Sequence, residues 1–436
     1  MSRLPSTGLS RRSFLSALAA VAGSGAAWPA RLEALAGELL EGGAPDDEGF
    51  WRMVRLQFPL PPDRIYLNNG TLGPSPHVVV EAVAEHARRV AMTYPPGVDW
   101  EALQAALGAF LDADPEGFVF PRNTTEAMSF VANGLELGPG DEVLTTDHEH
   151  IGGLCPWELV TTRRGALLRK VRLPVPASSP EGLLEEVWSG VTDRTRVVSV
   201  SHVTFTNGTT LPVAALARRC REAGIVSVVD GAHPPGLFPV SLRDVDADFY
   251  ASSPHKWLLA PQGTGLLWMR GPWRTRLWPT LASGGWDDLA LGARRFNHLG
   301  TFDESRLAGL LAAVAFHEAV RKERVEARVR HLHGRLRAAV ETISGVQVVT
   351  PRGAALSSGM LAFRLEGVDS LALQGHLGRA ANVRTRVIGE YGLGWMRLST
   401  HLYNLPHELD RVVELLHDVA RNGLPRGPAP RNEGYA

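Results

Sequence analysis

The chain is short of cysteine, of net charge and of long apolar runs. Its 436 residues include only two cysteines, Cys155 and Cys220, and both lie in helix-like apolar contexts. We therefore expect buried core thiols and no disulfide framework. The 45 basic and 46 acidic residues nearly balance, so the chain lacks the basic stripe that binds nucleic acid. Small disulfide scaffolds and nucleic-acid-binding proteins are thereby excluded.

The apolar segment near the N-terminus, residues 15–23, is too short to span a bilayer as a stable anchor. It follows a twin-arginine pattern around Arg11 and Arg12, and small residues suited to cleavage stand at 27–30. This order predicts that residues 1–30 are a twin-arginine signal peptide. We expect export to a periplasmic or extracellular location, with no stable membrane insertion.

The rest of the chain is long enough for two domains with a sizeable core. Alternating strand and helix patterns predict an α/β large domain over residues 65–304, with a mostly parallel seven-stranded sheet. Residues 31–64 are expected to form an N-terminal segment, residues 305–424 a smaller C-terminal α+β domain, and residues 425–436 a disordered tail. The strands of the large domain are expected at residues 117–120, 142–146, 167–171, 196–201, 225–229, 247–251 and 265–269.

Two further segments carry specific expectations. A helical pattern over residues 305–343 is expected to break near residues 321–324, where charges gather. Residues 273–302, rich in Gly and Trp with poor periodicity, indicate an active-site or dimer-contact loop, or else an ordinary surface connection. The strands of the smaller domain are expected at residues 346–349, 359–365, 383–385 and 395–398.

A carboxylate and a lysine follow two consecutive apolar strands. Asp230 ends the strand at residues 225–229, and Lys256 comes shortly after the strand that ends at Ser252. A lysine amine can form a Schiff base with a pyridine aldehyde, and a carboxylate can keep the ring nitrogen protonated. The protonated ring then withdraws electrons from a carbanion at the substrate's α carbon. The pair predicts pyridoxal 5'-phosphate as cofactor.

A polar turn upstream offers a phosphate site. Thr124 and Thr125 stand between the strand at residues 117–120 and a helical pattern over residues 127–133. This arrangement directs backbone N–H groups and the positive end of a helix dipole at an anion. The same residues also suit a simple helix N-cap. Both interpretations are compatible, because a capping turn binds phosphate when its donors face the ligand.

A third polar turn, Asp147 to His150, closes the strand at residues 142–146. Its two histidines raise the possibility of a metal site, but no further His or Cys stands at useful ligand spacing. We therefore expect no metal, and we expect the His150 ring to stack on the face of the cofactor.

These motifs, in this order, resemble the class V aminotransferase family of fold-type I PLP-dependent transferases. The resemblance runs from Ile65 to Asn404, and it is closest to the isopenicillin N epimerase-like group. The segments that carry it are Leu67–Thr71, Ser201–Thr204 and Asp230–His233.

The resemblance implies a role for each matching residue. Lys256 would be the Schiff-base lysine, Asp230 the partner of the pyridine nitrogen and His150 the stacking ring, and these three would be catalytic. His233 would lie near the ring hydroxyl. The phosphate would be held by Thr124, Thr125, Ser253 and His255.

The resemblance also implies a partner and a substrate. Thr301 would reach the phosphate of a neighbouring subunit, which makes the chain a homodimer. Arg397 would clamp the carboxylate of a small amino-acid substrate through a bidentate contact, with Arg384 as the weaker candidate. The expected activity is therefore chemistry at the α carbon of an amino acid.

Two positions depart from the family pattern. Phe205 stands where many relatives place an Asn that contacts the ring hydroxyl, and residues 386–394 lack the catalytic Cys of the desulfurase branch. We expect epimerase-like or aminotransferase chemistry, and not a cysteine desulfurase. A carbon–sulfur lyase and a non-catalytic PLP-binding relative are the alternatives. The intact set of Asp230, Lys256 and Arg397 argues against the latter, because a scaffold needs no carboxylate clamp.

Overall fold

The computed structural model describes residues 28–38, 42–93 and 97–425. The twin-arginine motif of the predicted signal peptide and nearly all of the predicted C-terminal tail lie outside these ranges. No helix within them is long and apolar enough to cross a membrane.

The larger sheet has the seven strands that the sequence predicted, and the α/β fold is confirmed. Four of its strand pairs are parallel, and β8 is antiparallel to both of its neighbours. The central strands consist almost entirely of buried residues, as is typical of a sheet covered on both faces. In spatial order the strands are β2 (Phe118–Val119), β8 (Leu266–Met269), β7 (Phe249–Ser252), β6 (Val226–Asp230), β5 (Thr195–Ser201), β3 (Glu142–Thr146) and β4 (Leu167–Val171).

Helices follow the parallel strands, and most begin at a residue whose side chain accepts a hydrogen bond from a backbone N–H of the first turn. Asn123, His150, Ser179 and Ser241 each do this. The caps at Asn123 and His150 make α6 and α7 begin within a few residues of the preceding strand. The helices are α6 (Thr124–Gly134), α7 (Ile151–Arg164), α8 (Pro180–Ser189), α9 (Val213–Glu222) and α10 (Leu242–Val245).

A smaller antiparallel sheet follows, in the order β12-β13-β10-β9. Its apolar face shares a core with the helices of the C-terminal part. The strands are β9 (Val346–Val348), β10 (Met360–Leu365), β12 (Arg386–Ile388) and β13 (Trp395–Ser399). The helices are α13 (Lys322–Val340), α14 (Ser370–Ala381) and α15 (Pro406–Asn422).

One strand prediction needs correction. The strand expected at residues 383–385 is β11 (Val383–Arg384), which pairs in parallel with β1 (Ile65–Tyr66) outside the four-stranded sheet. Residues 386–388, which lie outside every predicted strand, form β12. Two very short strands joined by a single residue produce no periodicity that a sequence pattern could reveal.

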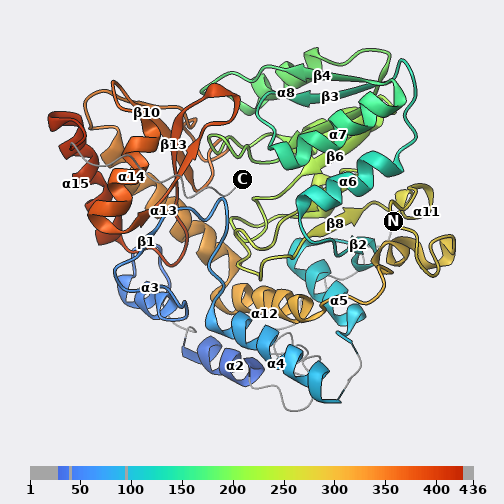
Figure 1. Cartoon of the computed structure of the whole chain (residues 1–436), viewed down its shortest axis with the longest axis horizontal. Coiled ribbons are helices and arrows are strands. Elements are labelled where there is room, and N and C mark those ends of the chain that lie inside the picture. The colour runs from blue at the N-terminus through green and yellow to red at the C-terminus, as the bar shows by residue number, and fades with distance from the viewer. Residues whose placement is uncertain (1–27, 39–41, 94–96, 426–436) are drawn as a thin grey trace.

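The break predicted in the long helical pattern is confirmed at Arg321, where φ is +76°. It separates α12 (Ser305–Val320) from α13. Although it is far from them in the sequence, α12 packs against three N-terminal helices, α2 (Trp28–Glu38), α4 (His77–Thr93) and α5 (Trp100–Leu111), and Figure 1 shows it beside α4. The N-terminal helix α3 (Glu48–Arg55) lies between α2 and α4 in the sequence.

The segment at residues 273–302 is less irregular than its composition indicated. It contains the short helix α11 (Trp273–Arg276) and the 3-10 segment η2 (Leu289–Asn297). Phe296 packs in the core beneath α6, so part of this segment is structural.

Candidate active site

A cavity of about 710 Å³ opens at the carboxyl end of the larger sheet, where residues of the smaller sheet close it. The sheet edge explains its position, because consecutive parallel strands present their carboxyl ends side by side. Arg384 and Thr301 do not line this cavity. The sequence-predicted residues that do line it are Thr124, Thr125, His150, Asp230, His233, Ser253, His255, Lys256 and Arg397.

Asp230 and Lys256 lie on neighbouring strand ends and influence each other's charge. Burial raises the pKa of Asp230, and the Lys256 ammonium opposes that shift. Burial lowers the pKa of Lys256 to about 8, although Asp230 favours its charged form. The lowered pKa gives Lys256 a larger neutral fraction near neutral pH than an exposed lysine has, and the neutral amine is the nucleophilic form. The Asp230 carboxylate is oriented by the backbone N–H of Ala232, which donates to Oδ1 at 3.0 Å.

A second feature of Asp230 is the space in front of it. A Cβ on Gly153 would lie 2.7 Å from Asp230 Oδ2. A side chain there would fill the space beside the carboxylate, so glycine keeps that oxygen accessible from the cavity. The arrangement leaves room for a flat ring whose nitrogen meets Asp230.

The start of α6 forms the predicted anion site. Its first residue, Thr124, is buried, and its hydroxyl lies 2.7 Å from the hydroxyl of Ser253. The Thr124 N–H also donates to Ser253 Oγ at 3.2 Å. Gly265 permits this approach, because a Cβ there would stand 2.5 Å from the backbone of Asn123. Hydroxyl groups and first-turn amides thus gather at a helix N-terminus, which is suited to phosphate.

His233 presents an unused donor to the cavity. Its Nδ1 accepts a hydrogen bond of 2.9 Å from the indole N–H of Trp257. Since an indole nitrogen can only donate, the neutral imidazole must carry its proton on Nε2. That atom is buried and has no hydrogen-bond partner among the described residues, which is costly unless a ligand accepts a hydrogen bond from it. Burial also lowers the pKa of His233 well below its usual value, so the ring is neutral.

His150 is the N-cap of α7 and lies at the cavity wall. Its Nδ1 accepts from the backbone N–H of Gly152 at 3.0 Å, and its ring meets Phe205 edge-on at 4.9 Å. Burial lowers the pKa of His150 to about 3, and the Lys256 charge adds to that effect. A neutral, fixed ring is suited to packing against another aromatic ring.

Arg397 reaches the cavity from β13 and is almost fully buried. It donates to the Phe205 carbonyl at 2.6 Å and to Thr71 Oγ1 at 3.0 Å, while its Nε has no hydrogen-bond partner in the described part of the chain. Burial lowers the pKa of Arg397 to about 9. A buried guanidinium without a carboxylate partner is unfavourable, and a bidentate substrate carboxylate would supply the missing charge.

Among the lining residues that sequence reasoning missed, Arg386, Glu390 and Cys155 carry side chains that can ionise. Arg386 and Glu390 form an ion pair. Sequence reasoning did not predict that they line the cavity, because it did not predict strand β12. Cys155 is exposed, so the prediction of a buried thiol was wrong for it, whereas Cys220 is buried as expected. Cys155 stands on the first turns of α7, whose N-terminus faces the cavity. Cys155 lies five residues after His150, on the helix that His150 caps. This spacing could have indicated that Cys155 lies near the cavity.

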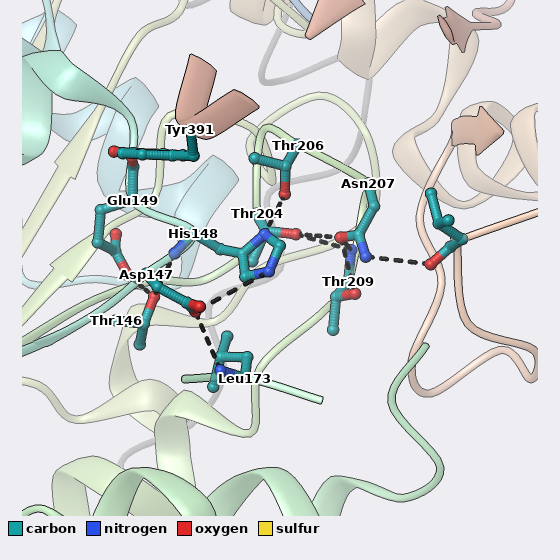
Figure 2. A network of polar contacts seen from close by, with 11 residues as sticks. Thr146, Asp147, His148, Glu149, Leu173, Thr204, Thr206, Asn207, Thr209 and Tyr391 are labelled. Atoms are coloured by element: carbon teal, nitrogen blue, oxygen red, sulfur yellow. Dashed lines mark hydrogen bonds and ion pairs between the residues drawn. The ribbon is translucent and has the colours of Figure 1, made fainter. Parts of the chain in front are cut away.

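Figure 2 shows a polar network that holds the turn between β3 and α7, which carries His150. Asp147 accepts from the backbone N–H of Leu173 at 3.0 Å, and His148 Nδ1 lies 2.6 Å from Thr206 Oγ1. The Tyr391 hydroxyl donates to the Glu149 carbonyl at 2.5 Å. The segment after β12 is thereby attached to the turn that carries His150.

A comparison with protein-family models places this site in a family. Residues 98–412 match the model for aminotransferase class V. The chain belongs to the class V aminotransferase family. The family-level resemblance drawn from the motifs is therefore confirmed.

Relatives of known function include two isopenicillin N epimerases. The one from Amycolatopsis lactamdurans is 33% identical over 394 residues, which cover 85% of this chain and 99% of the relative. The one from Streptomyces clavuligerus is 31% identical over 84% of this chain and 97% of the relative. Among solved structures, a cysteine desulfurase from Escherichia coli superposes with a TM-score of 0.75 at 25% identity, covering 86% of this chain and 98% of that structure.

The family uses pyridoxal 5'-phosphate, and the residues present fit that group. The unpartnered Nε2 of His233 and the open space beside Asp230 suit the ring, and the hydroxyl groups at the start of α6 suit the phosphate. Lys256, with its lowered pKa, would hold the aldehyde carbon. When bound, the cofactor supplies an electron sink for the bond that breaks at the α carbon.

Arg397→Lys is expected to weaken binding of the substrate carboxylate by about tenfold or more. A lysine keeps the charge but lacks the planar fork, and it cannot reach the Phe205 carbonyl and Thr71 at the same time as a ligand. The weaker binding should raise KM and change kcat much less. Unchanged KM together with a lowered melting temperature would instead assign Arg397 a structural role.

Proposed function

We propose that the chain is a PLP-dependent enzyme that epimerises the α carbon of an amino-acid substrate. The observation that carries this proposal is the make-up of the segment after β11. In place of a cysteine, this segment brings Arg386 and Glu390 to the cavity. Similarity to two isopenicillin N epimerases over nearly their whole length supports the same reaction class.

Three residues of the cavity have separate roles in this reaction. Arg397 binds the α-carboxylate and so fixes which bond at the α carbon stands perpendicular to the ring. Lys256, once freed from the cofactor, removes the α proton as a neutral amine. Asp230 would keep the ring nitrogen of the bound cofactor protonated, so that the ring could withdraw electrons from the α carbon. A solvent-derived proton delivered to the opposite face of the α carbon would invert the centre, whereas a proton delivered elsewhere would lead to transamination.

The test is to incubate the holoenzyme with single amino acids in D₂O. Epimerisation predicts solvent deuterium at the α carbon and loss of optical purity, read by mass spectrometry and chiral chromatography. Formation of a keto acid without inversion would assign aminotransferase chemistry. Release of sulfide or persulfide from cysteine as the main product would contradict both.

A carbon–sulfur lyase is the second candidate, favoured by the desulfurase structure and by the exposed position of Cys155 at the cavity. A cysteine desulfurase passes the substrate sulfur to a cysteine of the enzyme, and that cysteine must be a thiolate to accept it. Burial and Glu158 raise the pKa of the Cys155 thiol, and burial raises the pKa of Cys220 to about 12. Neither cysteine is thus a ready nucleophile near neutral pH.

We therefore expect the double variant Cys155→Ser, Cys220→Ser to keep most of the main activity. Serine is nearly isosteric and preserves the packing around α7 and α9. The check is the rate of α-deuteration beside a sulfide assay with L-cysteine. Rapid persulfide formation that the double variant loses would move the chain to desulfurase chemistry.

Two further properties are proposed. Thr301 is exposed and lies outside the cavity of its own chain, and we propose that it contacts the site of a second copy in a homodimer. We also propose, from the Arg11 and Arg12 motif, that the folded enzyme is exported by the twin-arginine pathway.

A further inference from the structure

Arg386 and Arg397 form a cross-strand pair. They are directly opposed in the antiparallel ladder of β12 and β13, and both line the cavity. Side chains of directly opposed residues lie on the same face of a sheet, with Cβ atoms roughly 5 Å apart, and like charges in that position are unfavourable. The site therefore concentrates positive charge on one wall.

The countercharge on this wall is incomplete. Glu390 pairs with Arg386, whereas within the described ranges no carboxylate forms an ion pair with Arg397. One carboxylate therefore faces two guanidinium groups, and it is paired with Arg386. Burial is the main cause of the lowered pKa of Lys256, and both guanidinium groups lower it further. A single substrate carboxylate on Arg397 would balance Arg397 and leave the Arg386–Glu390 pair intact.

The Arg386–Glu390 pair is accessible to a ligand. Its side chains keep 24% and 21% of their exposure, in contrast to the buried Arg397. Arg386 stands in β12 and Glu390 lies four residues later, in the turn that follows this strand. The Tyr391 side chain of that turn donates to the Glu149 carbonyl. The Glu390 carboxylate can therefore leave Arg386 by side-chain rotation alone, without displacement of the turn.

We propose that Arg386 is a second anion-binding residue of this site and that the substrate is an amino acid with a further carboxylate on its side chain. Arg397 binds the α-carboxylate and Arg386 binds the distal one. Glu390 occupies Arg386 in the free enzyme and is displaced on binding. This inference rests on the proposed function, because it assigns the α-carboxylate to Arg397.

The test compares two five-carbon acids, glutarate and pentanoate, as ligands of the holoenzyme. Neither has an amino group, so calorimetric binding does not depend on turnover. We expect glutarate to bind at least about tenfold more tightly than pentanoate. Arg386→Gln should abolish that preference and leave pentanoate binding unchanged. Glu390→Gln should increase glutarate affinity, because it removes the competing carboxylate.

Arg386→Gln should lower the glutarate affinity and Glu390→Gln should raise it. If the ion pair were only structural, both variants would bind glutarate more weakly. A matched control is Arg335→Gln, which removes an exposed arginine paired with Asp410 away from the cavity; its glutarate preference should equal that of the wild type. Equal wild-type binding of the two acids, weaker glutarate binding in Glu390→Gln, or cofactor loss in Arg386→Gln would overturn the inference. Binding of neither acid would contradict the proposed function as well.

Discussion

Lys256→Ala is expected to lower turnover by about 10³-fold or more, with the fold retained. The side chain is both the attachment point of the cofactor and the base that removes the α proton, and loss of a positioned base alone costs about 10²–10⁴-fold. Burial of Lys256 lowers its pKa to about 8, which suits both tasks. Steady-state turnover and circular dichroism of the purified variant would check the expectation.

The chain offers a close control, because it contains only three lysines. Lys170 pairs with Glu158 on the surface, and Lys322 donates to the Phe110 carbonyl. Lys170→Ala should keep wild-type turnover. Substantial turnover that persists in Lys256→Ala, with the cofactor bound, would remove Lys256 from the mechanism.

Asp230→Asn is expected to lower kcat by on the order of 10²-fold, the cost of losing one preorganised electrostatic contact to the transition state. The amide can still accept from the Ala232 N–H, so the local backbone should be preserved. It cannot hold a proton on the ring nitrogen, and the carbanion is then poorly stabilised. The cofactor absorbance of the variant should therefore be nearly normal, whereas its kcat should be reduced.

The outcome for Asp230 also distinguishes two roles of a buried carboxylate. If Asp230 were purely structural, the Asn variant would have a lower melting temperature and a kcat close to that of the wild type. Near-normal kcat in the Asn variant would accordingly refute the electron-sink role. Asp248→Asn provides a contrast, since Asp248 binds Ser227 and Arg270 within the sheet and does not line the cavity.

The sequence was sufficient to place Asp230 and Lys256 together. Each follows a buried apolar strand, and neighbouring parallel strands bring their carboxyl ends to one edge. The Thr124 cap was equally accessible, because the cap and the strand before it are local signals. Local patterns of this kind placed Asp230, Lys256, Thr124, Thr125 and His150 at the cavity, and the family resemblance supplied His233, Ser253, His255 and Arg397.

Arg386, Glu390 and the orientation of Cys155 could not be predicted in the same way. Arg386 faces the cavity because β11 ends and β12 begins within three residues, and a shift of one residue in a strand reverses which face a side chain occupies. The proton on His233 Nε2 depends on Trp257, which lies 24 residues further along the chain. Such features arise from tertiary contacts that no local pattern encodes.

The central claim is that Lys256 carries the cofactor, and one measurement tests it most directly. Borohydride reduction of the holoenzyme fixes the Schiff base as a stable secondary amine, and peptide mapping by mass spectrometry then locates it. The expected result is a single labelled peptide containing Lys256. A label on Lys170 or Lys322, or a bound cofactor that leaves no label on any lysine, would contradict the assignment.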